Sequence, residues 1–278
     1  MTVSNALFGA VGATTDSVNL VMAAAAGFDG GTFTAANVET INLNATDTST
    51  ATGITAMTVV VTGDKATTLN VTGNAGAALT LTSSVKLATL DASASTGAVS
   101  ATSVSTAAIT MKGGSAADSF VANGTTASTL LGDGGADTLT TNLGLTTLTG
   151  GAGNDLFVIP GAAANGNVYT TITDATAGDR IQLFDVASGT EVWNTTAISL
   201  AGTASFSDYL NAASTSGTGA TTAQISWFAF GGNTYIVEDA SDSTSFFAGT
   251  DAVVALTGVV DLSAASLNGA ADPILMIG

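Results

Sequence analysis

The chain has 278 residues and a formal net charge of −17 at pH 7. It contains neither cysteine nor histidine, which excludes a disulfide scaffold, thiol catalysis, the Ser-His-Asp triad and the usual zinc or copper sites. Four basic residues stand against 21 acidic ones, so we expect no nucleic-acid or anionic-lipid partner, whereas divalent cations suit such a surface. We therefore expect a protein that is not an enzyme.

No apolar run approaches the length of a membrane span. The longest run near the start covers residues 20–28 and is mostly alanine, so we expect no membrane insertion. No Lys or Arg precedes Lys65, so a classical N-terminal signal peptide is not expected, and an export signal is expected elsewhere in the protein.

The first part of the chain, rich in Thr and Ala, predicts many short strands. A strand is possible over residues 16–22, and residues 23–31 predict a loop. From residue 37 onward, short runs alternate apolar and polar residues between turn signals. These runs predict strands at residues 38–43, 57–61, 68–71, 78–81, 87–90 and 108–111.

The spacing of these strands indicates a solenoid. Three of them end at Val61, Val71 and Leu81, ten residues apart, which is typical of the rungs of a β-solenoid. No aromatic residue lies between Phe33 and Phe120, so the core must be thin, and a narrow coil suits it better than a sandwich. Asp64, Asn74 and Asp91 lie at turns and could bind further ions. Because polar residues are common in solvated turns, we expect that ordinary role for them.

Three near-copies of one nine-residue phrase follow, over residues 113–121, 132–140 and 150–158. The third copy fits the nonapeptide G-G-x-G-x-D-x-U-x at every fixed position, where U is a large apolar residue. The first copy has Ala116 in place of the third glycine, and the second has Asp133 in place of the second glycine. The copies start about two nonapeptides apart, so we expect them to stack on one edge of a parallel β-roll.

The residue types in this phrase indicate a calcium site. Glycine permits positive φ, so successive carbonyl oxygens can converge between neighbouring coils, and the aspartate adds a carboxylate there. Six or more oxygens at flexible distances suit Ca²⁺ better than Mg²⁺. The apolar Phe120, Leu139 and Phe157 are expected to point inward. The predicted ligand residues are Gly114, Ala116 and Asp118 in the first copy, Gly132, Asp133, Gly135 and Asp137 in the second, and Gly150, Gly151, Ala152, Gly153 and Asp155 in the third.

An electrostatic argument predicts that these turns need the ion. Coils stack about 4.8 Å apart, so Asp118, Asp137 and Asp155 would form a ladder of like charges. Each neighbouring pair would repel by roughly 3 kcal/mol at an effective dielectric constant near 20. We therefore expect the roll to be disordered without calcium and ordered with it. The alternative is that the phrase is ordinary turn sequence without a metal.

After Val158 the composition changes, because ten of the 16 aromatic residues lie between Phe184 and Phe247. The Gly-Gly-Asn sequence at 231–233 predicts a hairpin, and residues 205–213 predict a short helix. We expect a globular cap that hides the last rung of the roll, although an aromatic cluster could instead be a carbohydrate platform. The predicted strands cover residues 170–173, 180–183, 225–230, 234–237 and 252–256.

The third copy and its two partners resemble the RTX (repeats-in-toxin) nonapeptides of proteins exported by type I secretion. The blocks at residues 172–183, 227–237 and 247–259 are similar to the serralysin-like C-terminal module of that group. Together with the Thr/Ala-rich solenoid and residues 37–48, the order of blocks resembles the C-terminal part of Caulobacter-type surface-layer proteins. The resemblance covers almost the whole chain.

This resemblance implies a calcium-dependent β-roll, two-dimensional crystallisation on a bacterial cell surface and an uncleaved C-terminal signal for the type I secretion machinery. It also implies that Asp174 and Asp179, which follow the repeats, hold calcium, although a charged turn would explain them equally well. The departures at Ala116 and Asp133 leave the geometry of the first two coils open. The anchoring region that attaches such lattices to lipopolysaccharide has no counterpart in these residues.

The sequence as a whole predicts an all-β fold: a right-handed parallel β-solenoid over residues 1–111, a calcium-binding RTX β-roll over 112–160, and a β-rich cap over 161–278 that carries the secretion signal. The predicted function is that of a secreted structural protein of the surface layer (S-layer), which folds on binding extracellular Ca²⁺ and assembles with identical chains. The alternatives are an RTX adhesin and the non-catalytic secretion module of a secreted enzyme.

Overall fold

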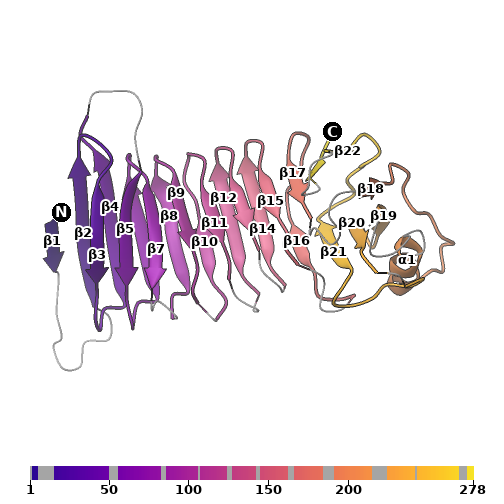
Figure 1. Ribbon diagram of the computed structural model, residues 1–278, viewed down its shortest axis with the longest axis horizontal. Coiled ribbons are helices and arrows are strands. Elements are labelled where there is room, and N and C mark those ends of the chain that lie inside the picture. Colours follow the sequence, from indigo (N-terminus) through magenta and orange to yellow (C-terminus); the bar gives the residue numbers. More distant parts are fainter. Residues whose placement is uncertain are drawn as a thin grey trace. The chain divides into compact units, whose positions relative to one another are not determined.

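The computed structural model describes residues 2–5, 16–49, 56–82, 86–105, 107–123, 127–141, 145–161, 166–183, 191–214, 224–241, 243–268 and 274–278. The fold is a parallel β-solenoid of about seven turns with a C-terminal antiparallel part (Figure 1). The chain divides into two compact units. The first comprises Met1–Leu139 and Gly151–Gly153, and the second comprises Thr140–Gly150 and Asn154–Gly278.

In the first unit, successive strands alternate between two sheets, so one strand from each sheet makes a coil. The pairs between solenoid strands with a determined register are parallel, whereas β1 is antiparallel to β2. The first sheet contains, in order, β1 (Thr2–Asn5), β2 (Ser17–Ala24), β4 (Thr40–Asp47), β6 (Thr68–Gly73), β8 (Thr89–Ser95), β10 (Thr110–Lys112) and β12 (Thr129–Gly134). The second contains β3 (Asp29–Thr34), β5 (Met57–Thr62), β7 (Ala77–Thr82), β9 (Val99–Thr102), β11 (Ser119–Val121) and β13 (Thr138–Thr140).

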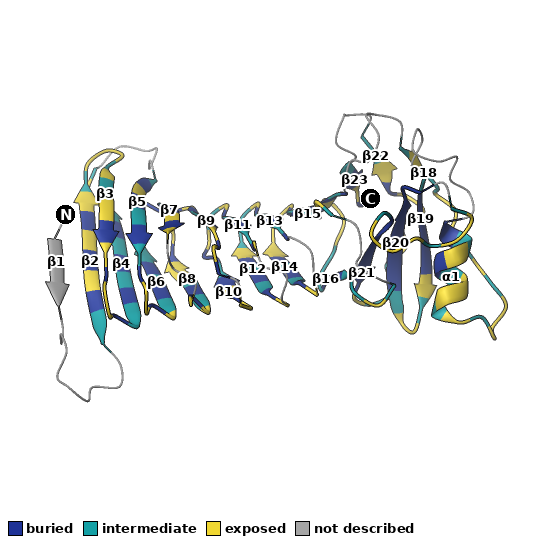
Figure 2. Cartoon of the chain, turned by 60° about the horizontal axis from the view of Figure 1, so that its bottom comes forward, coloured by how far each residue is buried: buried dark blue, intermediate teal, exposed yellow. Residues whose placement is uncertain are grey.

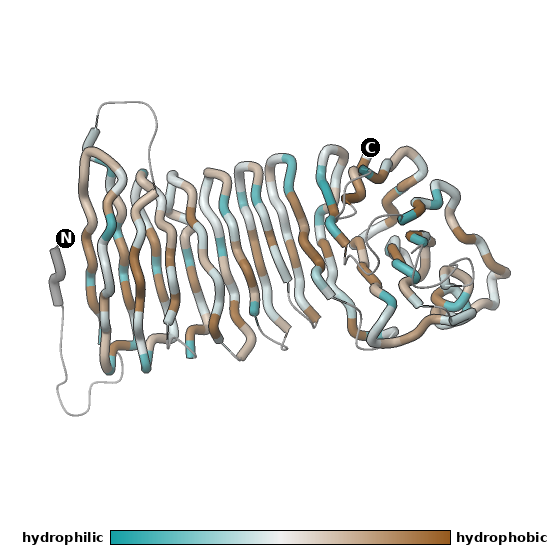
Figure 3. The backbone as a smooth tube through the Cα atoms, viewed as in Figure 1, coloured by the Kyte–Doolittle hydropathy of each residue, from teal (hydrophilic) through white to brown (hydrophobic). Residues whose placement is uncertain are grey.

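The thin core of this unit follows from the alternation of side chains along each strand. In β4, Ile41, Leu43 and Ala45 are buried and the residues between them are partly exposed. The same alternation of buried and exposed bands is visible along β2 in Figure 2, and hydrophobic segments alternate with polar ones along the solenoid in Figure 3. The narrow coil predicted from the lack of aromatic residues is confirmed.

The ten-residue spacing in the sequence corresponds to half a coil. Val61 and Leu81 are partners in the second sheet, whereas Val71 pairs with Leu43 in the first. The loop predicted over residues 23–31 is wrong in part, because β2 continues to Ala24 and β3 begins at Asp29. The alternating pattern weakens there because small residues replace the larger apolar ones.

Asparagine side chains form a ladder on the outer surface of the first sheet. The amide of Asn42 donates to Asn19 Oδ1 at 2.9 Å, and the amide of Asn70 donates to Asn42 Oδ1 at 2.8 Å. These residues are exact partners in the parallel register. The side-chain hydrogen bonds therefore reinforce the alignment of three successive coils. The ladder is kept although the coils differ in length, with 23 residues from Asn19 to Asn42 and 28 from Asn42 to Asn70.

The second unit begins as a solenoid and ends as an antiparallel sheet. Here β14 pairs with β16 and β15 with β17, both in parallel, and β16 then pairs with β21. Strand β21 continues antiparallel into β20 and β19, while β23 covers the edge of β17. The strands are β14 (Thr147–Ala152), β15 (Leu156–Val158), β16 (Thr170–Ile172), β17 (Arg180–Gln182), β18 (Val192–Trp193), β19 (Gln224–Phe230), β20 (Asn233–Asp239), β21 (Ala252–Leu256), β22 (Ser266–Leu267) and β23 (Ile274–Met276).

The expected cap over the last coil is present in this unit. The hairpin between β19 and β20 turns through Gly231 and Gly232, which have φ values of 59° and 86°. The helix α1 (Phe206–Ala213) begins at Ser205, whose side chain accepts from the Asp208 N–H while the Asp208 side chain accepts from the Ser205 N–H. Strands β21 and β23 cover the outer edges of β16 and β17, which hides the backbone groups of the last coil.

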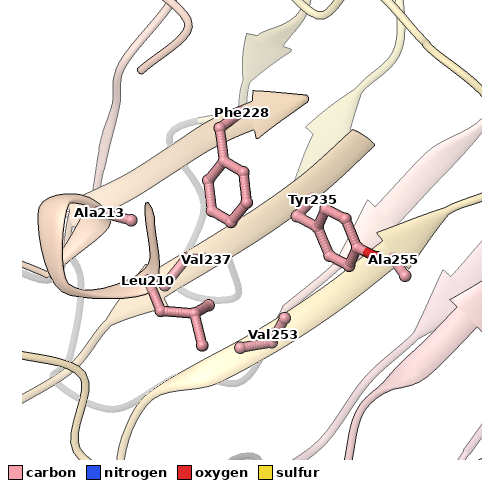
Figure 4. Close-up of a cluster of buried hydrophobic side chains, with 7 residues drawn as sticks. All are labelled: Leu210, Ala213, Phe228, Tyr235, Val237, Val253 and Ala255. Carbon is pink, nitrogen blue, oxygen red and sulfur yellow. The ribbon is translucent and has the colours of Figure 1, made fainter. Parts of the chain in front are cut away.

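The aromatic residues of the second unit build its core. Phe228 is fully buried and Tyr235 is 7% exposed, and their stacked rings have centroids 5.4 Å apart. Leu210 and Ala213 of α1 pack against Val237, Val253 and Ala255 of the sheet (Figure 4). This packing supports the interpretation of the aromatic residues as core, not as a carbohydrate platform. Phe184, the first of the ten, lies outside the described residues.

Where the structure describes the chain, it contains no helix of the length and apolar character that a membrane crossing requires.

Candidate metal-binding turns

The glycine-rich phrases form the turns between a strand of the first sheet and the next strand of the second. The first copy connects β10 to β11, the second connects β12 to β13, and the third connects β14 to β15. Their apolar residues Phe120, Leu139 and Phe157 are all fully buried, so they point inward as predicted.

The second and third copies share a backbone conformation that the first lacks. Positive φ occurs at Asp133 (70°) and Gly135 (121°), and again at Gly151 (97°) and Gly153 (147°). Aspartate is one of the few residues other than glycine that tolerates this region, which explains how Asp133 can replace the second glycine. Neither residue at the corresponding positions of the first copy, Gly114 and Ala116, has a positive φ. The positive-φ backbone that the predicted turn requires is therefore present in two copies and absent from the first.

Neighbouring turns in the first unit lie in backbone contact. A methyl group on Gly151 would collide with the carbonyl oxygen of Asp133, and one on Gly153 would collide with that of Gly135. Gly135 in turn lies against the backbone of Ala116. Glycine is required at these positions both for its φ and because no side chain fits between the coils.

Asp118 and Asp137, the aspartates at the sixth position of the first two copies, turn inward and bind backbone N–H groups. Asp118 is 2% exposed, and its two carboxylate oxygens accept from the N–H groups of Val99 and Gly114, each at 2.7 Å. Asp137 is 1% exposed and accepts from the Asp118 N–H at 2.7 Å. Each carboxylate thus accepts from the backbone N–H of the residue that occupies the equivalent position in the preceding coil.

Coils without an aspartate at this one position, called acid-free coils below, satisfy the same N–H with a carbonyl. Ala77 N–H donates to the Ala98 carbonyl at 3.0 Å, and Met57 N–H donates to the Gly76 carbonyl at 3.3 Å. The aspartate carboxylate therefore accepts the hydrogen bond that, in the other coils, the backbone carbonyl of the preceding residue accepts. At Asp118 and Asp137 a negatively charged, buried acceptor replaces a neutral one.

Two further turns of the same kind escaped the sequence analysis. By register, Ala77 and Val99 occupy the aspartate position, and Leu79 and Ala101 occupy the buried apolar position. The turns before them have Gly73, Gly76 and Gly97 in close contact with neighbouring backbone. The nonapeptide pattern is hidden there because its acidic residue is missing, so glycine spacing was the only remaining signal.

The post-repeat aspartates repeat this arrangement in the second unit. Asp179 Oδ1 accepts from the Asp155 N–H at 2.9 Å, and its Oδ2 accepts from the Thr176 N–H at 2.8 Å. Asp174 accepts from the Gly150 N–H at 2.9 Å. Asp155 and Asp179 are almost completely buried. Asp179 is thus structurally equivalent to the nonapeptide aspartates, which the sequence does not reveal because its turn has only one glycine, Gly178.

The surroundings of the Asp118 carboxylate disfavour its charged form. Burial raises the pKa of Asp118 above its ordinary value of 3.8; the Val99 and Gly114 N–H groups oppose this, and the charge of Asp133 adds to it. Lys112 Nζ lies 3.4 Å from Asp133 Oδ2, but both side chains are about two-fifths exposed, so this pair contributes little.

A cation at these turns would depend on backbone oxygens. Among the described residues, no group of three or more acidic side chains is close enough to hold a metal ion. The carbonyls of Gly114 and Ala152 already accept from Gly134 and Gly135 N–H, but a carbonyl oxygen keeps a second lone pair. The residues Gly132, Gly150, Gly151 and Gly153 would contribute backbone only, while Asp118, Asp137 and Asp155 carry the charge.

The other turn residues considered from the sequence have ordinary turn roles. Asp64 accepts from the Asn37 N–H, and Asn74 accepts from the Asp47 N–H. Asp91 accepts from the Ser93 side chain and N–H, and these bonds lower its pKa. These contacts support the solvated-turn interpretation.

The architecture and these stacked turns define the class of protein: a parallel β-solenoid with a C-terminal antiparallel module. Neither a protein-family model nor a curated protein matches the chain.

Proposed function

We propose that the chain is a secreted structural protein whose glycine-rich turns bind Ca²⁺. The observation that carries this proposal is the ladder of buried carboxylates at residues 118 and 137, which replaces neutral carbonyls found in acid-free coils. Two carboxylates about 4.8 Å apart repel by roughly 3 kcal/mol at an effective dielectric constant near 20. A divalent cation that also binds turn carbonyls would reverse the sign of this interaction.

Calcium concentration supplies the switch in this proposal. Extracellular modules bind Ca²⁺ at about 10⁻⁴–10⁻³ M, so the turns would remain ion-free in the cytosol and load outside the cell. Ion binding would then contribute directly to folding, because the unfolded chain has no preformed site. The unfolded form is the one suited to transport by the type I machinery, which the resemblance to RTX proteins implies.

The resemblance to surface-layer proteins supports the final step of the proposal, assembly of identical chains into a two-dimensional lattice on a bacterial surface. The winding in this proposal is right-handed, as is usual for parallel crossover connections. The Thr/Ala-rich residues 1–111 contain few charged side chains, which suits close packing of copies once calcium has neutralised the acidic turns.

Circular dichroism and electron microscopy of the full chain, with Ca²⁺ and with excess chelator, test the proposal. We expect β-structure to increase on calcium addition and ordered sheets to form only with calcium. Full β-structure in chelator would refute the calcium switch. A soluble monomer that binds glycans at high calcium would indicate an adhesin, and an enzyme domain encoded upstream would indicate a secretion module.

A further inference from the structure

Threonine side chains form two adjacent columns on the outer surface of the second sheet, within the first unit. In the first column, Thr34 pairs with Thr62 and Thr62 pairs with Thr82, on the neighbouring strands β3, β5 and β7 (Figure 1). The second column, which reaches β9, contains in order Thr32, Val60, Thr80 and Thr102. These seven side chains, called the threonine face below, are exposed or half-exposed, while the residues between them are buried.

The positions of these side chains repeat in two directions. Neighbouring coils are about 4.8 Å apart, and alternate residues along one strand are about 6.6 Å apart. Threonine is β-branched, so its χ1 angle is restricted and its hydroxyl and methyl groups keep fixed directions. The hydroxyl oxygens of Thr62 and Thr82 are 2.7 Å apart in one hydrogen bond, which orders the first column further. The threonine face is therefore a two-dimensional array of hydroxyl and methyl groups.

The threonine face carries no charge, although the formal net charge of the chain is −17. Asp29 on β3 pairs with Thr58 beside the face, and its Oδ1 accepts from the Thr58 hydroxyl at 3.1 Å and from the Gly31 N–H at 2.9 Å. The outer surface of the first sheet differs, because its asparagine ladder continues in register to Asp91 and Lys112. A charged ligand has no counter-charge within the threonine face.

The size and composition of the threonine face disfavour two common occupants. Its spacings give it an area of roughly 200–300 Å², whereas a stable contact between two proteins buries about 800 Å² on each partner. This face alone is therefore too small for a stable contact with a second copy. It contains no aromatic residue, so it offers no ring for stacking with a sugar. The occupant that fits is uncharged and itself repeats in two dimensions.

We propose that the threonine face binds the surface of ice. Ice is uncharged and presents hydrogen-bond donors and acceptors at fixed repeats, and the two spacings of the face are close to the repeats of oxygen atoms on its crystal planes. The threonine hydroxyls join this hydrogen-bond pattern, while the methyl groups and Val60 order the water between them. Adsorbed protein then opposes growth of the crystal. This activity is separate from the glycine-rich turns, because β3 to β9 precede the first copy.

Slow freezing of a solution of the full chain tests this proposal. Ice that grows slowly excludes ordinary solutes, so the amount of protein retained in the ice measures adsorption. We expect the monomeric parent chain, isolated by gel filtration, to be enriched in the ice relative to a protein without ice affinity. It should also slow the recrystallisation of fine-grained ice. Thr80→Lys places a charge and a longer side chain within the face and should abolish both effects.

The matched control makes the same substitution on the other sheet. Thr110 is an exposed residue of β10, so Thr110→Lys should keep both effects. Circular dichroism checks the fold of each variant. If Thr80→Lys unfolds, Thr80→Ser decides, because it removes only a methyl group from an exposed site and should still weaken retention in ice.

Two results would overturn the proposal directly: exclusion of the parent chain from ice, or equal retention of the parent chain and the folded Thr80 variant. Self-association of the parent chain that Thr80→Lys abolishes, without retention in ice, would also overturn it. That result would assign the threonine face to contact between copies of the chain.

Discussion

The carboxylate of Asp137 accepts the backbone N–H of Asp118 at 2.7 Å, one coil earlier in the solenoid. The same bond in acid-free coils uses a neutral carbonyl, as between Ala77 and Ala98. Replacing that carbonyl by a carboxylate keeps the hydrogen bond but adds a buried charge to each level. The acidic coils are therefore built like their neutral neighbours, and the charge is the feature that distinguishes them.

The substitution Asp137→Asn should have opposite effects with and without calcium. The asparagine oxygen can still accept from the Asp118 N–H, but the charge is removed. In chelator, relief of repulsion should raise the free energy of unfolding, by about 1–3 kcal/mol at an effective dielectric constant near 20. In calcium, loss of a ligand should lower it. Thermal denaturation under both conditions checks the sign, with Asp261→Asn as control; equal shifts in the two media would contradict the calcium site.

Gly153→Ala should strongly destabilise the solenoid. Its φ of 147° is unfavourable for alanine, and the new methyl group would collide with the Gly135 carbonyl oxygen. We expect a loss of about 2–4 kcal/mol from strain and displaced coils. The control Gly202→Ala introduces a methyl group with nothing within 4 Å. Chemical denaturation of both variants measures the difference, and similar stability of the two would show that the turns are not closely stacked.

The acid-free coils should remain folded when calcium is removed. The strands from β4 to β9 are joined by carbonyl acceptors and by uncharged side-chain ladders, so no ion is needed there. Hydrogen exchange of the full chain in chelator should show protection in these strands and loss of protection in β11 and β13. Uniform loss throughout the first unit would show that the acid-free coils depend on the acidic ones.

Asn42→Ala should weaken the solenoid by breaking two rungs of the asparagine ladder. Asn42 donates to Asn19 and accepts from Asn70, and both hydrogen bonds are partly exposed. We expect a loss of about 1–2 kcal/mol. Thr80→Ala, which changes an exposed residue of β7, is the control. Urea denaturation measures both; an effect of Asn42→Ala no larger than that of Thr80→Ala would show that the ladder is energetically neutral.

Tyr169 should titrate late. Burial raises its pKa to about 12, and the hydrogen bond and charge of the neighbouring Tyr235 act in the same direction. Between its ordinary value of 10.0 and this value, the unfolded chain loses the proton while the folded chain keeps it. Stability should therefore fall as pH rises above about 10. Absorbance at the phenolate band measures the ionised tyrosines at that pH. The parent chain should show one ionised tyrosine fewer than a mixture of Tyr169→Phe with an equal amount of free tyrosine. Equal titration of the two samples would refute the shift.

Much of the solenoid could be predicted because its signals are local. The alternation in β4 to β7, the Gly-Gly-Asn hairpin before Tyr235 and the capped helix after Ser205 each need only neighbouring residues. The hidden turns before Ala77 and Val99 could not be predicted, since their aspartate is absent and only coil register reveals their equivalence.

By itself, the sequence determined the strand-rich class, the thin core and the position of the acidic turns, because side-chain alternation and glycine spacing are properties of consecutive residues. The tertiary structure alone decided which coils are equivalent, that the first copy lacks positive φ, and which N–H each carboxylate binds. These relationships depend on register between strands distant in the chain, and coil lengths that vary from 19 to 28 residues conceal that register from any fixed sequence period.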